Sequence, residues 1–163
     1  MVGQVVNKTP QNPPHAVTIR LVSKALEQLC GEVRDLRVQL PIALSDLSEP
    51  EPDLAVVRGK PVDYLDEHPR PDQIVLLVVV SDSTLERDRR RKLPLYAAAG
   101  VGEVWLVDLV ARRLETHREP SLKGFGRTTI LLVDHSLAPL FAPDSEIKIV
   151  DLLPPLRALA GEL

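Results

Sequence analysis

The amino-acid sequence predicts an α/β domain with a mixed β-sheet and helices on its faces. Of the 163 residues, 44 % are hydrophobic but only 3 % are aromatic, so the core must consist mainly of aliphatic side chains. Residues 74–80 form an unbroken apolar run, which is typical of a strand buried on both faces. Segments of helical periodicity alternate with such strands, an order that favours a sheet between helices. The whole chain, residues 1–163, fits the size of one domain.

The first half of the chain is predicted to contain one helix followed by two strands. Asn12 precedes two prolines, a pattern typical of a helix start. Apolar residues then recur at helical spacing until Gly31, which is a natural end for a helix. Residues 33–41 and 53–58 are the expected strands, and a polar turn at residues 46–52 separates them.

The second half is predicted to contain a second helix and further strands. Ser83 and Glu86 have the spacing of a capping box, which predicts a helix from there to Gly100. Residues 104–109 are expected to form a second buried strand. Later strands are expected at residues 114–118, 129–133 and 146–150, with a candidate terminal helix at residues 151–163.

Composition and motifs exclude several classes of function. The net charge of −3 provides no overall basic field that would attract nucleic acid. A single cysteine, Cys30, excludes an internal disulfide framework and is expected to lie in the core. The four histidines lack the spacing of zinc ligands, and no phosphate-binding loop is recognisable. No apolar run reaches the ~18 residues of a membrane span and no signal peptide is recognisable, so the cytoplasm is the expected compartment.

Two carboxylates at the start of a predicted strand are candidate metal ligands. Glu51 and Asp53 are two residues apart, so in an extended chain their side chains point the same way. Oxygen ligands of this kind suit Mg²⁺ or Mn²⁺. The alternative is an acidic turn that keeps a sheet edge soluble, which is the commoner role of such residues.

The second predicted helix presents a polar stripe. Asp88, Lys92 and Tyr96 are four residues apart and share one helix face. A lysine there could stabilise the negative charge that develops on a phosphate. The alternative is a surface ion pair between Asp88 and Lys92, which would contribute only a few tenths of a kcal/mol.

The same helix carries a basic segment. Residues 86–92 include five basic and two acidic side chains, a net charge of +3. Arg89, Arg90 and Arg91 are candidate nucleic-acid contacts, because guanidinium groups bind phosphates bidentately. A solvated helix face is the alternative, and no interleaved aromatic residues indicate base stacking.

Several segments match, in order, the pattern of a known family. The matching segments are 11–15 (QNPPH), 38–42 (VQLPI), 48–59 (SEPEPDLAVVRG), 78–85 (VVVSDSTL), Asp88, 92–97 (KLPLYA), Gly100 and 105–108 (WLVD). Together they resemble the Uma2 family (DUF820), which is similar to restriction endonucleases, and the resemblance covers about residues 3–120.

The resemblance implies a restriction-endonuclease-like, PD-(D/E)XK fold and a metal-dependent endonuclease that acts on DNA. In that fold a Pro-Asp element and a glutamate on the neighbouring strand bind Mg²⁺ or Mn²⁺, and a lysine assists. Pro52 and Asp53 match the Pro-Asp element, and Lys92 matches the lysine. The bound metal would polarise the phosphodiester and generate hydroxide from water.

Two departures from the family pattern bear on activity. The family reads Val-Glu-Val-Ser on the central strand, but here Val79 occupies the glutamate position. The acidic strand that usually begins the family is shortened, because this chain starts with Met1-Val2-Gly3. We therefore expect an impaired endonuclease. The alternative is an inactive nuclease-fold protein that serves as a binding module or forms a homodimer through an open sheet edge.

Overall fold

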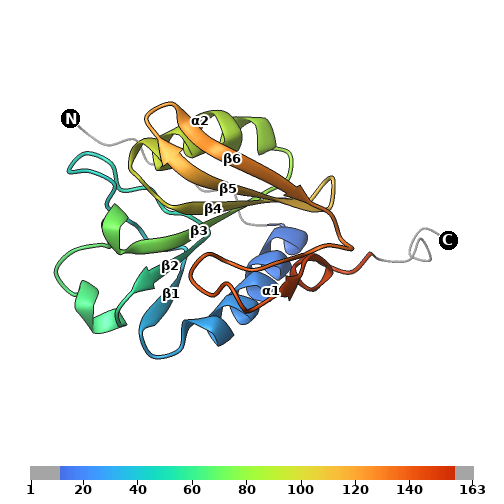
Figure 1. The fold of residues 1–163 in the computed structure, drawn as a ribbon, viewed down its shortest axis with the longest axis horizontal. Coiled ribbons are helices and arrows are strands. Elements are labelled where there is room, and N and C mark those ends of the chain that lie inside the picture. The colour runs from blue at the N-terminus through green and yellow to red at the C-terminus, as the bar shows by residue number, and fades with distance from the viewer. Residues whose placement is uncertain (1–11, 157–163) are drawn as a thin grey trace.

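The structure is a computed structural model that describes residues 12–156 (Figure 1). It begins with helix α1 (Pro13–Cys30), where the Asn12 side chain accepts a hydrogen bond from the backbone N–H of His15 at 3.0 Å. The predicted helix start is therefore confirmed, and Cys30 is buried in the core as expected. The shortened strand expected before α1 lies outside the described residues.

Six strands form one mixed sheet in the order β1 to β6. Their bounds are β1 (Arg34–Val38), β2 (Leu54–Arg58), β3 (Ile74–Ser81), β4 (Glu103–Asp108), β5 (Arg113–Ser121) and β6 (Gly124–Leu131). β3 and β4 are parallel because helix α2 (Leu85–Ala98) connects them, and every other neighbouring pair is antiparallel. The mixed sheet flanked by helices confirms the predicted fold class.

The two helices cover opposite faces of the sheet (Figure 1). Side chains alternate along β3, so Val78 and Val80 join the core under α1 while Leu77 and Val79 join the core under α2. Both buried strands predicted from apolar runs are therefore central strands. Their alternation determines which residues face the polar stripe of α2.

The buried carboxylate of Glu103 connects β4 to β5 and to the segment after β6. Glu103 is fully buried and accepts hydrogen bonds from Trp105 Nε1 at 3.0 Å, Arg118 Nε at 2.8 Å and the backbone N–H of Leu140 at 2.9 Å. These donors satisfy a charge whose burial would otherwise be costly. The segment after β6 is held against the sheet in this way.

The predicted capping box at the start of α2 is wrong. Helix α2 begins after Thr84, which makes no capping hydrogen bond through its side chain. Ser83 instead donates from its backbone N–H to Asp82 at 2.6 Å, and Glu86 pairs with Arg89 at 2.8 Å. The hydrogen bond between Asp82 and Ser83 and the ion pair between Glu86 and Arg89 therefore replace the reciprocal hydrogen bonds of a capping box.

The last part of the chain also differs from expectation. The strand expected at residues 146–150 is reduced to β8 (Ile147–Lys148), which pairs with β7 (Ser136–Leu137) in a separate small sheet. A short 3-10 helix (Ile149–Leu152) follows, and the described part of residues 151–163 contains no longer helix. Two prolines at positions 154 and 155 disfavour helix there. Among residues 12–156, no helix is long and apolar enough to cross a membrane.

Candidate functional site

The candidate site forms where β2 begins beside the end of β3. The antiparallel register that pairs Leu54 with Val78 places Asp53 beside Val79 on the α2 face. The Asp53 carboxylate accepts a hydrogen bond from the backbone N–H of Val80 at 2.7 Å, and its side chain is 17 % exposed. Asp53 is therefore a fixed, partly buried carboxylate, whereas Glu51 lies exposed ahead of the strand. The metal-binding role of Glu51 stays a prediction.

His15 on α1 lies against the same carboxylate. Its Nε2 is 3.0 Å from the carbonyl oxygen of Val80 and 3.8 Å from Asp53 Oδ1. Within the described part of the chain, its buried Nδ1 has no hydrogen-bond partner. Sequence reasoning treated His15 as one of four scattered histidines and missed this position. The available signal was that His15 ends the first segment that resembles the family.

Burial affects the charge of Asp53. Loss of solvation raises the pKa of Asp53, although the Val80 N–H, a protonated His15 and Lys92 act in the opposite direction. The charge of Asp88 adds to the increase. The structure therefore favours the neutral form of Asp53 more than water does.

The predicted stripe on α2 is confirmed, but it is more buried than a surface ion pair. Lys92 Nζ is 3.1 Å from Asp88 Oδ1, and the Asp88 side chain is only 7 % exposed. The other oxygen of Asp88 accepts hydrogen bonds from the hydroxyl groups of Ser81 and Thr84. Tyr96 is also buried, and its burial together with the charges of Asp53 and Asp88 raises the pKa of its hydroxyl group.

These side chains do not fit a resident divalent cation. Val79 is 1 % exposed and offers no oxygen where the resemblance places a glutamate. Both oxygens of Asp88 already have partners, and one oxygen of Asp53 accepts the Val80 N–H. Within residues 12–156, no three His, Cys, Asp or Glu side chains are arranged to hold a metal ion.

The three arginines predicted to contact nucleic acid occupy different environments. Arg89 donates to Glu86 at 2.8 Å and forms a two-pronged pair with Glu115 on β5. Arg90 and Arg91 are exposed on α2. The structure therefore separates Arg89, which is engaged inside the protein, from its two neighbours.

Glu115 is the centre of a buried polar network. Its side chain is 3 % exposed and also contacts His117 Nε2 at 3.0 Å, while Thr128 contacts the other ring nitrogen of His117 at 2.9 Å. Burial alone would raise the pKa of Glu115, but the hydrogen bonds from His117 and Arg89 outweigh it and lower that pKa to about 2. The network joins α2 to β5 and β6.

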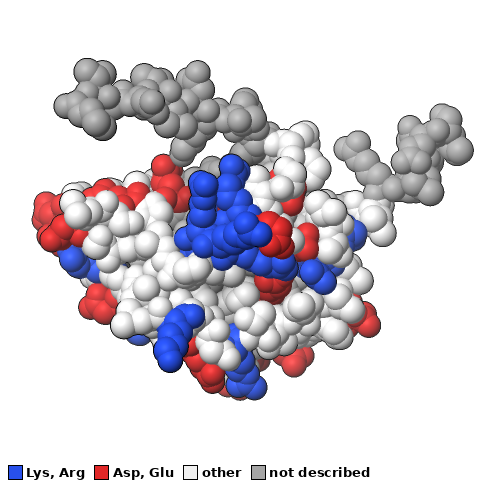
Figure 2. Space-filling model, turned by 90° about the horizontal axis from the view of Figure 1, so that it is seen from above, with Lys and Arg blue, Asp and Glu red and all other residues white. Residues whose placement is uncertain are grey.

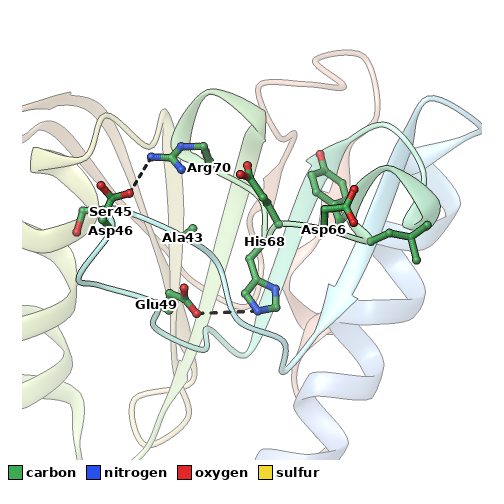
Figure 3. A pocket seen from close by; sticks show the side chains of 10 residues that line it. Ala43, Ser45, Asp46, Glu49, Asp66, His68 and Arg70 are labelled. Carbon is green, nitrogen blue, oxygen red and sulfur yellow. Dashed lines mark ion pairs between the residues drawn. The ribbon is translucent and has the colours of Figure 1, made fainter.

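A polar hollow of about 460 Å³ lies elsewhere, between the loops around residues 43–49 and 64–70 (Figure 3). Across it Glu49 approaches His68 at 4.0 Å and Arg70 approaches Asp46 at 3.7 Å, as the dashed lines show. Neither Asp53 nor Lys92 lines this hollow. We therefore place the candidate site at Asp53 and not in this hollow.

Comparisons with known proteins agree with the fold. The family model Uma2, described as "Putative restriction endonuclease", matches residues 2–147. A similar solved structure is "a putative nuclease belonging to DUF820" from Anabaena variabilis, with a TM-score of 0.67 and 13 % sequence identity. That match covers 93 % of this chain and 87 % of the other chain. No curated protein matches the chain.

The Glu115 network predicts a specific dependence of stability on pH. The folded-state pKa of Glu115 is depressed, so its contribution is present above the ordinary value of 4.5 and is lost as pH falls towards about 2. Between these pH values the wild type should lose about 3 kcal/mol more unfolding free energy than Glu115→Gln. Urea unfolding followed by circular dichroism measures the difference. Parallel losses in both proteins would contradict the pairing of Glu115 with Arg89 and His117.

For Asp53 the dependence of folding stability on pH is expected to have the opposite sign. Because burial raises the folded-state pKa of Asp53, its contribution to stability is greatest below pH 3.8 and declines as pH rises through the folded-state value. Asp53→Asn should therefore be more stable than the wild type at pH 7 and similar to it at pH 3. The exposed Asp66→Asn is the control and should leave stability unchanged. A less stable Asp53→Asn at pH 7 would show that the charge serves the fold.

Proposed function

Because the chain belongs to the Uma2 family, we propose that it is a DNA endonuclease in which hydrolysis is impaired by Val79. The observation that carries this proposal is the β2–β3 register, which places Val79 beside Asp53 on one face of the sheet. A glutamate at position 79 would complete a pair of carboxylates there. Valine leaves Asp53 without that neighbour.

The retained residues support the nuclease part of the proposal. Asp53 is held at the start of β2, and Lys92 lies on the facing helix, close enough to affect the pKa of Asp53. A carboxylate and a cation at one end of a sheet provide the charges needed to orient and stabilise a phosphate. In this chain Lys92 also pairs with Asp88, and its partly exposed ammonium group has further N–H donors for a substrate phosphate.

The surroundings of Val79 support impairment. Val79 belongs to a buried apolar cluster that includes Leu93, Tyr96 and Leu106. The position is therefore part of the core, and it offers no oxygen ligand. Mg²⁺ or Mn²⁺ is the cofactor that the family implies, but the side chains present do not fit a resident ion. We expect any hydrolysis by the wild type to be slow.

A second candidate function follows from the same observation. Because Val79 packs as a core residue, the chain is also suited to act as an inactive nuclease-fold protein that binds a partner. Homodimer formation, a single domain over residues 1–163 and a cytoplasmic location are further proposals. The cytoplasmic location rests on the single cysteine, which suits a reducing compartment.

Restoring the carboxylate tests the proposed function. Val79→Glu should convert a slow or silent protein into one that nicks supercoiled plasmid DNA with Mn²⁺ or Mg²⁺. A gain of about 10²-fold is the scale of one well-placed electrostatic group. Gel analysis of plasmid forms over time measures the rate.

The matched controls separate chemistry from folding. Val79→Gln has the shape of the glutamate variant without its charge and should stay inactive. Adding Asp53→Ala to Val79→Glu should abolish the gain. Circular dichroism establishes that each variant is folded. Absence of cleavage by a folded Val79→Glu would refute the nuclease proposal in favour of the binding module, and equal cleavage by the wild type would refute impairment.

A further inference from the structure

Helix α2 divides its basic residues between two environments. Lys92 pairs with Asp88 and Arg89 pairs with Glu115, and the side chains of both carboxylates are almost completely buried. Buried carboxylates hold their cations strongly, because separating such a pair leaves an uncompensated charge. Arg89 also forms an ion pair with Glu86, the exposed acidic residue of the first turn. These two cations are therefore paired with buried carboxylates, although their own side chains are partly exposed.

The remaining arginines of α2 face the solvent. Arg87, Arg90 and Arg91 are exposed, and spacings of three and four residues place them on one side of the helix. Within the described residues, none of the three forms an ion pair with a carboxylate. Figure 2, which views the molecule from the α2 side, shows Lys and Arg side chains gathered in the middle of this face.

We propose that Arg87, Arg90 and Arg91 form the surface that binds the phosphate backbone of duplex DNA, an inference that rests on the proposed function. Guanidinium groups suit this partner, because their paired donors match phosphate oxygens. Arg87 and Arg91 are about 6 Å apart along the helix axis, or roughly two 3.4 Å steps of one DNA strand. Arg89, predicted from sequence as a contact, belongs to the internal network instead.

The composition of this surface determines the kind of recognition. Tyr96, the aromatic residue of α2, is buried, so α2 offers no ring on which a base could stack. Contacts to phosphates alone carry no sequence information. Binding through α2 is therefore independent of DNA sequence and depends strongly on salt.

Acidic residues elsewhere on the molecule oppose the attraction of DNA to the surface formed by Arg87, Arg90 and Arg91. The chain has a net charge of −3, and acidic side chains gather towards one end of the face in Figure 2. The loops around the polar hollow contribute exposed Asp46, Glu49, Asp66 and Glu67. Like charges there repel the DNA backbone, which disfavours a duplex over those loops.

The test is the salt dependence of binding to a fluorescent 20-bp duplex, measured by anisotropy. Each phosphate contact makes the slope of log K against log salt steeper by about 0.9. The slope of the triple variant R87Q/R90Q/R91Q should therefore be shallower than that of the wild type by about 2.7. From 50 to 200 mM salt those contacts account for about a 40-fold change in affinity. Two duplexes of unrelated sequence should bind equally within about twofold.

A matched triple variant removes the same charge from the other side of the sheet. Arg20, Lys24 and Lys148 are exposed, and Lys24 and Lys148 line a hollow beside α1. R20Q/K24Q/K148Q should keep the wild-type slope. Arg89→Gln should also keep the slope but unfold at lower urea concentration, because it removes the two-pronged cation from buried Glu115 and leaves His117 as the partner shown.

The outcomes separate this inference from the proposed function. An unchanged slope in R87Q/R90Q/R91Q, or an equal loss in the α1-side variant, would overturn the assignment of the surface. A loss of slope in Arg89→Gln would overturn the exclusion of Arg89. A wild type that binds neither duplex at 50 mM salt would also refute this surface, whereas plasmid cleavage by Val79→Glu decides the nuclease proposal separately.

Discussion

The antiparallel pairing of β2 with β3 is the constraint on which the site depends. It places Asp53 beside Val79 and lets the Asp53 carboxylate accept the N–H of Val80. A slip of one residue would turn Val79 towards α1 and remove it from the polar end of α2. Packing of α1 on the face of the sheet that carries Val80 brings His15 to the carbonyl group of Val80. The strand register and the packing of α1 together assemble residues that lie far apart in the sequence.

Buried carboxylates then decide which cations are available for function. Asp88 engages Lys92, Glu115 engages Arg89, and Glu103 engages Arg118. Each carboxylate requires these donors, since a buried charge without partners is costly. On α2, the cations left for an external anion are Arg87, Arg90 and Arg91 on its outer side. The internal network and the proposed DNA surface thus follow from the same distribution of charge.

The sequence predicted the features that depend on local patterns. Apolar runs identified β3 and β4, and four-residue spacing identified the shared face of Asp88 and Lys92. The capping box failed because Asp82 captured the N–H of Ser83. Arg89 and Glu115 are 26 residues apart, and no local pattern indicates that they pair. His15 was missed for the same reason, because its neighbours belong to distant strands.

The central claim is that Val79 deprives Asp53 of the second carboxylate that a metal site needs. Isothermal titration calorimetry with Mn²⁺ tests this claim directly, with no DNA present. Val79→Glu should bind one ion per chain, whereas the wild type and the Val79→Glu/Asp53→Ala protein should show no saturable binding. A wild type that binds one ion as tightly as Val79→Glu would contradict the account.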